Sequence, residues 1–266
     1  MDKLGVAYIT AKMLKCGTKN KSAEELENAF RNFGTDLHIN ISKERISYNL
    51  LCVNRDFAEL LQLVNEVLTQ PRWDEKEFDK LKRETLSLIE VSLSNPQKLG
   101  IKEFEKAVLG DIPLAYPVEG IKDTVENLTL DDVRDFYDKF FTPEICNVVI
   151  AGNIDKETVV KTFDDFKWTY RPASAIILPD IRPSEKVVSH VDYPKANQSF
   201  IVIGNQAITR NDKDYIPAYV ANYKLGNGSS GLLFKVLRLE HGYTYGAYSS
   251  FVASKSFGMF RAYSNV

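Results

Sequence analysis

Hydrophobic and polar positions along the chain follow two periods, and each period predicts one kind of element. Apolar residues spaced three and four positions apart predict a first helix that ends at Leu14, followed by helices at 22–33, 57–68, 75–93, 98–108, 130–140, 155–166, 215–225 and 232–239. Strict alternation, or a short apolar run, predicts strands at 36–41, 45–53, 147–151, 186–192, 199–205, 244–251 and 257–263. The run at 147–151, Asn-Val-Val-Ile-Ala, is apolar enough to predict a buried strand.

Local signals mark the starts of two helices. Ser22 is followed three residues later by Glu25, and Thr129 is followed in the same way by Asp132. In this arrangement each side chain bonds the backbone N–H of the other residue, which caps the first turn of a helix. Both pairs therefore predict a helix N-terminus.

The order of the elements predicts the fold class. Strands and helices mix without strict βαβ alternation, which favours an α+β fold with mostly antiparallel sheets packed against helices. Residues 167–184 lose periodicity and gather Pro172, Pro179 and Pro183, as linkers do. We therefore expect one module at 1–168, a linker at 169–186 and a second module at 187–266.

Composition excludes several classes of partner. The 266 residues are 44% hydrophobic, and 34 Lys and Arg against 36 Asp and Glu give a net charge of −2. This balance provides no broad attraction for nucleic acid or anionic membranes. No apolar run approaches the roughly 18 residues of a membrane span. The sequence predicts a soluble protein and leaves its compartment open, whether periplasmic or cytoplasmic if bacterial.

Neither the cysteines nor the histidines suggest a metal or disulfide site. Cys16, Cys52 and Cys146 are an odd set without paired spacing, which favours burial as small hydrophobic side chains over disulfide bonding. The three histidines are isolated from one another, with no second ligand at helical or strand spacing. We therefore expect no metal in this chain.

The most informative stretch is 226–250. A small-residue loop, Gly-Asn-Gly-Ser-Ser-Gly, leads into the apolar helix at 232–239, and Gly242 occupies the place of a left-handed C-cap. The loop lacks the Lys-Ser/Thr of a phosphate-binding loop and follows a helix, so a helix N-cap is the preferred interpretation over a hinge or a substrate-facing loop. Because this helix runs directly into a strand, Arg238 at the helix end and Tyr245 at the strand start are expected to lie close together. A guanidinium and a phenol together make a donor pair for an anion or a carbonyl oxygen.

Residues 5–20 near the N-terminus form a second informative motif, called the N-terminal frame below. It reads Gly-Val-Ala-Tyr-Ile-Thr-Ala-Lys-Met-Leu-Lys-Cys-Gly-Thr-Lys-Asn. Together with the stretch around Arg238, this frame resembles the M16 (pitrilysin/insulinase-type) zinc metallopeptidases. In that family the frame reads Gly-x-Ala-His-x-x-Glu-His-Met-Leu-x-x-Gly-Thr-Lys-Asn. The resemblance implies two M16-type modules, of which the second is incomplete at Val266.

The residues that bind zinc in the family are missing from this frame. The first zinc His is Tyr8, the general-base Glu is Ala11 and the second zinc His is Lys12. By the family's spacing, the third ligand, a Glu on a long helix, falls on Leu88. Two His at i and i+4 share a helix face and bind zinc, whereas a Lys ammonium has no lone pair to donate.

The resemblance therefore implies a catalytically inactive half or subunit of an M16 zinc peptidase. In the family two modules enclose a chamber, with zinc on one module and an Arg/Tyr pair on the other. Arg238 and Tyr245 match that pair, so they are the expected catalytic residues, in support of a partner's zinc. Zinc and the active M16 module are then expected in a separate chain or in another part of the same polypeptide, and the substrate is a peptide.

Two other interpretations remain open at this stage. The chain could be a structural subunit with a vestigial chamber, although such a subunit has no physical need for the Arg/Tyr pair. It could also be a non-enzymatic peptide-binding module that uses an exposed sheet edge. Association with a protein that has an intact His-x-x-Glu-His motif would favour the first interpretation.

Overall fold

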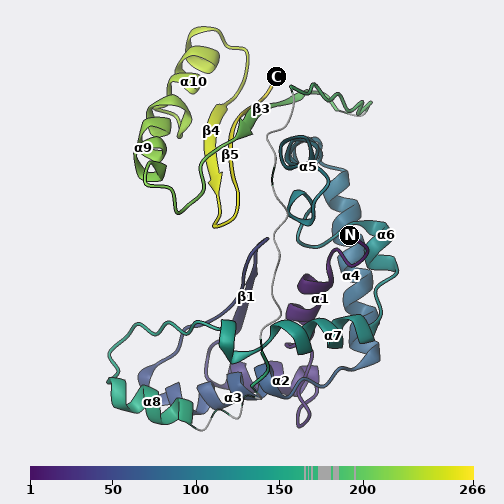
Figure 1. Cartoon of the computed structure of the whole chain (residues 1–266), viewed down its shortest axis with the longest axis vertical. Coiled ribbons are helices and arrows are strands. Elements are labelled where there is room, and N and C mark those ends of the chain that lie inside the picture. Colours follow the sequence, from purple (N-terminus) through teal and green to yellow (C-terminus); the bar gives the residue numbers. More distant parts are fainter. Residues whose placement is uncertain (165, 167, 169, 173–180, 182–185, 195) are drawn as a thin grey trace. The chain divides into compact units, whose positions relative to one another are not determined.

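In a computed structural model the chain folds into two compact units, which are described separately below (Figure 1). The structure describes residues 1–164, 166, 168, 170–172, 181, 186–194 and 196–266. The N-terminal unit comprises Asp2–Ser87 and Val118–Ile176, and the C-terminal unit comprises Leu88–Pro117 and Ile177–Val266, together with Met1. The boundary between the units falls inside one long helix. The division into 1–168, 169–186 and 187–266 stays a prediction, and most of the expected linker lies outside the described residues.

The N-terminal unit is mainly helical. Its strands β1 (Leu37–Ile41) and β2 (Ile46–Leu50) form an antiparallel pair. Its helical elements are α1 (Val6–Met13), α2 (Ala23–Asn32), η1 (Asn54–Asp56), α3 (Phe57–Thr69), α4 (Glu75–Leu93, whose end belongs to the C-terminal unit), α6 (Lys122–Glu126), α7 (Leu130–Phe140), η3 (Pro143–Ile145) and α8 (Lys156–Asp164). Both predicted capping boxes are present, at Ser22 and at Thr129.

The core of this unit collects apolar residues from the faces that the periodicity predicted. Phe30 and Leu26 of α2, Leu60 of α3 and Leu14 are almost fully buried. They pack with the buried side chains of Leu37, Leu63, Val67, Tyr137 and Phe141. Because these side chains come from both ends of the unit's sequence, packing joins 118–176 to the N-terminal helices.

The C-terminal unit is an antiparallel sheet with helices on both faces. Its elements are α5 (Pro96–Leu109), η2 (Pro113–Ala115), β3 (Phe200–Gln206), α9 (Tyr215–Gly226), α10 (Leu232–Phe234), the π-helix η4 (Lys235–Glu240), β4 (Ala247–Ala253) and β5 (Gly258–Asn265). The strand order is β3-β5-β4. In Figure 1, α9 and α10 lie on one side of this sheet and α5 lies on the other. The predicted mixture of helices and antiparallel sheets is confirmed.

Alternation along the strands explains the two covered faces of the sheet. Met259 of β5 is buried in a cluster with Phe104 and Val108 of α5. Ser249 of β4 points the other way, where its hydroxyl donates to Asn222 Oδ1 of α9 at 2.6 Å. Successive side chains of a strand point to opposite faces, so both helices are held by the same three strands.

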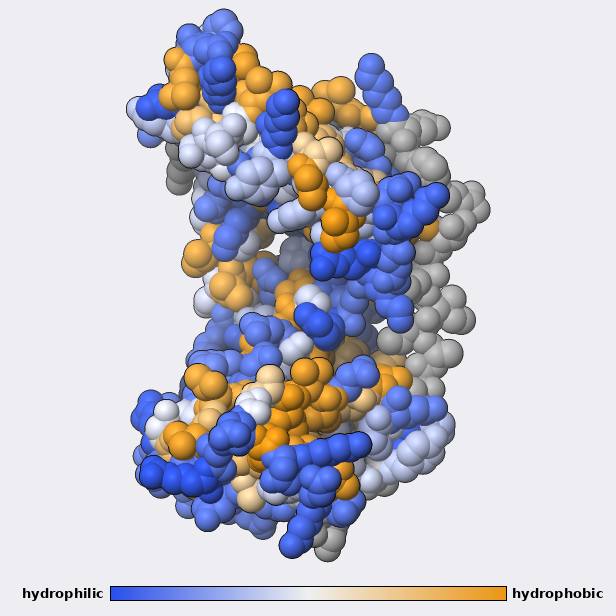
Figure 2. All heavy atoms as spheres, turned by 90° about the vertical axis from the view of Figure 1, so that its left-hand side faces the viewer, coloured by the Kyte–Doolittle hydropathy of each residue, from blue (hydrophilic) through white to orange (hydrophobic). Residues whose placement is uncertain are grey.

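Two predicted strands are wrong. Residues 147–151 and 186–192 are described, yet they form no strand, and Val149 and Val188 are 90% and 91% exposed. An apolar run favours a strand, but a strand also needs a ladder of hydrogen bonds to a partner, and none of the described strands pairs with these segments. Hydrophobic surface is also visible on the lower part of the molecule in Figure 2.

The prediction for the cysteines is wrong in one case. Cys146 is exposed, whereas Cys16 and Cys52 are half-buried. All three are free cysteines, and none forms a disulfide. Within the described part of the chain, no helix is both long and apolar enough to cross a membrane.

Candidate functional site

The helix that carries Arg238 ends in an unusually wide turn. Residues Lys235–Glu240 form a π-helix, and the His241 N–H donates to the Val236 carbonyl at 3.1 Å. Gly242 then adopts a left-handed conformation with φ 69°, as its C-cap position predicted. The Gly242 N–H donates to the Arg238 carbonyl at 3.2 Å, which closes the helix. Single π turns inside helices often occur at functional sites.

Arg238 and Tyr245 are in direct contact. The guanidinium carbon of Arg238 lies 4.7 Å from the centroid of the Tyr245 ring, within the range of a cation–π interaction. Tyr245 is 77% exposed, so its phenol remains available to a ligand. The residue lies just before β4, which begins at Ala247, so the predicted strand start at 244 is too early. The structure thus brings together the two residues that the sequence singled out.

A second aromatic pair lies next to the first along the chain. The rings of His241 and Tyr243 stack with centroids 5.1 Å apart and an interplanar angle of 7°. Tyr243 is 65% exposed. This stack was not predicted, because it depends on the direction that the chain takes after Gly242.

Two glycines of the small-residue loop at 226–231, Gly226 and Gly231, are required by close packing. A Cβ on Gly226 would lie 2.4 Å from the backbone nitrogen of Ser249, which is too close for any side chain. Gly231 is the N-cap residue of α10, as expected, although it has no side chain with which to cap. The loop therefore lets α9 approach β4, the strand that follows Tyr245.

The residues that the resemblance assigns to the zinc positions do not fit a zinc ion. On α1, the Lys12 ammonium lies 4.6 Å from the centroid of the Tyr8 ring, so an aromatic ring and a cation take the place of two imidazoles. Ala11 is completely buried. Leu88, on α4, is 39% exposed and has no metal-binding atom. The described residues include no group of three His, Cys, Asp or Glu placed to hold a metal ion.

The Cys16 thiol, which lies 3.5 Å from the Lys12 carbonyl oxygen, does not replace the missing ligands. Burial, with a smaller contribution from the nearby carboxylate of Glu77, raises the pKa of the Cys16 thiol to about 11, although Lys12 opposes the shift. A thiol must lose its proton to bind a metal. Cys16 is therefore protonated at neutral pH and is a poor ligand.

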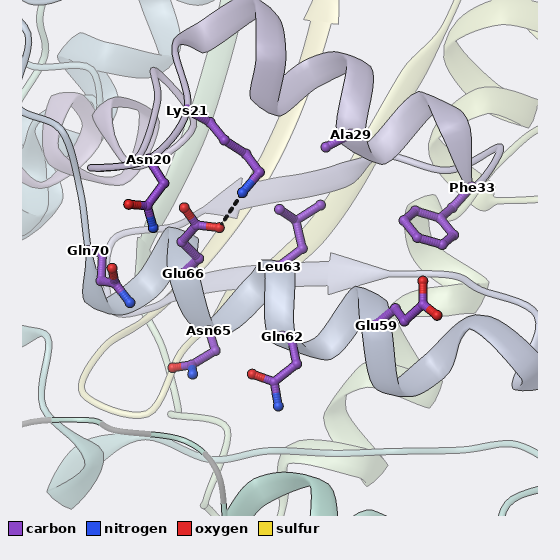
Figure 3. A pocket seen from close by; sticks show the side chains of 10 residues that line it. All are labelled: Asn20, Lys21, Ala29, Phe33, Glu59, Gln62, Leu63, Asn65, Glu66 and Gln70. Atoms are coloured by element: carbon purple, nitrogen blue, oxygen red, sulfur yellow. Dashed lines mark hydrogen bonds and ion pairs between the residues drawn. The ribbon is translucent and has the colours of Figure 1, made fainter.

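A separate cleft of about 430 Å³ lies between α2 and α3 in the N-terminal unit (Figure 3). Asn20, the last residue of the N-terminal frame, lines this cleft. Thr18 Oγ1 donates to Glu66 at 2.6 Å, and the Lys21 ammonium bonds the same carboxylate at 2.7 Å. Burial raises the pKa of Glu66, but the bonds from Lys21 and Thr18 outweigh it and hold this pKa below its usual range. These contacts give Thr18 of the N-terminal frame a structural role that requires no part in catalysis.

Removing this carboxylate should make stability less dependent on pH. A lowered pKa in the folded state means that Glu66 stabilises the fold above its unfolded pKa and loses that contribution as the pH falls through the folded pKa. We expect Glu66→Gln to lower the free energy of unfolding by about 1–2 kcal/mol at pH 7 and by much less at pH 3. Urea denaturation at the two pH values measures this difference. Glu59→Gln, at an exposed residue of the same cleft, is the control, and an equal loss at both pH values would contradict the assignment.

Comparison with known proteins identifies the family. The profile described as the insulinase family (peptidase family M16) matches residues 1–121, and that described as the peptidase M16 inactive domain matches residues 127–266. The second match alone covers more than half of the chain, so this chain belongs to the M16 peptidase family. It is a member without the His-x-x-Glu-His motif in its sequence.

Individual relatives agree with this assignment. An uncharacterized zinc protease of Streptomyces coelicolor is 27% identical over 97% of this chain and 58% of its own length. The protein named non-peptidase homolog YmxG of Helicobacter pylori is 23% identical over 93% of this chain and 57% of its own length. The chain thus spans less than two thirds of the length of these relatives.

Solved structures show the same fold. The crystal structure of a peptidase M16 inactive domain from Pseudomonas fluorescens superposes with a TM-score of 0.90 at 25% identity, and the match covers 99% of this chain and 65% of that one. A protease from Helicobacter pylori superposes with a TM-score of 0.89 at 19% identity, which supports the fold alone.

Proposed function

We propose that this chain is a catalytically inactive half or subunit of an M16 zinc peptidase. It would bind peptide in a chamber shared with a zinc-bearing M16 module and supply Arg238 and Tyr245 to that module's site. The observation that carries the proposal is the contact of the Arg238 guanidinium with the ring of the exposed Tyr245, 4.7 Å from its centroid. The substitutions at the zinc positions support the inactive part of the proposal.

The two side chains have distinct roles in this proposal. The Tyr245 hydroxyl donates a hydrogen bond to the scissile carbonyl as its oxygen gains negative charge. A donor aimed at developing charge stabilises the transition state more than the substrate. The Arg238 guanidinium holds the Tyr245 ring by its cation–π contact and binds acceptors of the substrate backbone.

Reconstitution tests the proposal. Purified alone, the chain should contain no stoichiometric zinc by elemental analysis and should cleave no fluorogenic peptide. Co-expressed with an M16 module from the same organism that has an intact His-x-x-Glu-His motif, it should form a complex that cleaves peptide, whereas that module alone does not. The reason is that zinc and the Arg/Tyr pair come from different modules.

Each other outcome of this experiment supports a different function. One zinc per chain that survives mild chelation would overturn the inactive assignment. A complex whose activity equals that of the zinc module alone would favour the structural subunit. Peptide binding by the isolated chain without any complex would favour the non-enzymatic peptide-binding module.

A further inference from the structure

The segment between η4 and β4 holds one buried residue between two exposed tyrosines. Tyr243 is 65% exposed and Tyr245 is 77% exposed, whereas Thr244 between them is only 5% exposed. The segment bends at Tyr245, before β4 begins, and its Thr is buried while the tyrosines on both sides of it are exposed. The buried Thr244 is a polar residue, and its hydroxyl must therefore find partners inside the unit.

The Thr244 hydroxyl is the centre of a small hydrogen-bond network. Thr244 Oγ1 accepts the Gly246 N–H at 3.1 Å and lies 2.9 Å from Ser264 Oγ. It donates to the Asn265 carbonyl, and the Ser264 hydroxyl donates to the Gly246 carbonyl at 3.1 Å. Each hydroxyl has one proton, so the two hydroxyls satisfy the two carbonyls between them.

This network fixes the backbone around Tyr245. Thr244 precedes Tyr245 and Gly246 follows it, and both are bound through the same hydroxyl. The network also reaches the end of β5, where Ser264 pairs with Ala247 of β4. The structure gives the Tyr245 side chain no hydrogen bond to any described residue, so the backbone and the contact with Arg238 determine where the ring lies.

We propose that Thr244 is the positioning residue of the Arg238–Tyr245 pair. Its hydroxyl ties the backbone of Tyr245 to β5, so that the phenol stays over the guanidinium and in place for a peptide carbonyl. The positioning is a property of the isolated chain. Its consequence for catalysis rests on the proposed function.

A spectroscopic signal reports the positioning without any peptidase activity. A side chain held over an aromatic ring is shifted upfield in proton NMR spectra, so the Arg238 side-chain protons should show such a shift in the wild type. We expect Thr244→Val to abolish this shift, as Tyr245→Leu does by removing the ring. Thr244→Ser retains the hydroxyl and should retain the shift.

Activity of the reconstituted complex provides the second measurement. Thr244→Val should lower kcat about tenfold, because a displaced donor binds the transition state less well. KM should change less than about twofold, since the substrate-binding surface remains. Thr244→Ser should restore kcat. Circular dichroism verifies folding, and if Thr244→Val does not fold, Ser264→Ala, which removes the neighbouring hydroxyl, should cause a partial loss of both the shift and kcat.

The outcomes separate the two proposals. An Arg238 shift that persists in a folded Thr244→Val variant, or in Ser264→Ala where that variant replaces it, would overturn the positioning role, whatever the activity. A shift that is lost while kcat is unchanged would leave the positioning role in place and contradict the proposed function instead.

Discussion

The variant Tyr245→Phe is expected to lower kcat of the assembled peptidase about 10²–10³-fold, with little change in KM. The substitution removes one hydroxyl and leaves the ring that contacts Arg238 at 4.7 Å. If the hydroxyl acts mainly on charge that develops in the transition state, its loss appears in kcat and not in substrate binding. Steady-state hydrolysis of a fluorogenic peptide by the reconstituted complex measures both constants.

Tyr243→Phe is the matched control for this experiment. Tyr243 lies two residues away in the same segment and is similarly exposed, but it stacks on His241 and not on Arg238. It should change kcat less than about twofold. Equal activity of the wild type and Tyr245→Phe would exclude the Tyr245 hydroxyl from the mechanism and favour the structural subunit. An equal loss in both variants would indicate an effect on the segment and not on a single donor.

Local features of the fold were the ones that the sequence predicted well. The capping box of Ser22 and Glu25 involves four consecutive residues, and the structure contains it. The predicted helices at Glu75–Leu93 and Leu130–Phe140 match α4 and α7 at both ends. Their starts and stops depend on side chains within one turn, so no distant contact decides them.

Features that depend on distant partners were predicted less well. The run at 147–151 has the composition of a buried strand, but a strand also needs a hydrogen-bonded partner, and none of the described strands pairs with this run. The π-helical turns of Lys235–Glu240 likewise have the same apolar pattern as an α-helix. Periodicity reports which residues favour an element and not what lies next to it.

The candidate site was predicted as a list of residues and not as a geometry. Arg238 and Tyr245 were singled out because a helix end and a strand start meet at Gly242, and the left-handed Gly242 is present. The cation–π contact and the buried Thr244 between the tyrosines were not predicted. The burial of Thr244 depends on its hydrogen bonds to Ser264 and Asn265 of β5, which the local pattern around Tyr245 does not report.

Gly226→Ala should destabilise the C-terminal unit strongly, with a loss of about 3 kcal/mol in the free energy of unfolding. In a helix, Ala is intrinsically favoured over Gly by about 1 kcal/mol, so propensity alone predicts a gain. The new Cβ, however, would lie 2.4 Å from the backbone nitrogen of Ser249 and 2.3 Å from its hydroxyl oxygen. A backbone atom of the β4–β5 ladder cannot rotate away as a flexible side chain does, so the clash should outweigh the propensity.

The matched control is Gly152→Ala, because a Cβ at Gly152 meets only the Asn54 side-chain oxygen, at 4.0 Å. Urea denaturation should show a change within about 0.5 kcal/mol for this variant. Gly226→Ala should also weaken the upfield shift of the Arg238 protons, because α9 holds the strand β4 that follows Tyr245. A Gly226→Ala variant as stable as the wild type would show that α9 can move away from β4 at little cost. The small-residue loop would then have no packing role in holding the candidate site.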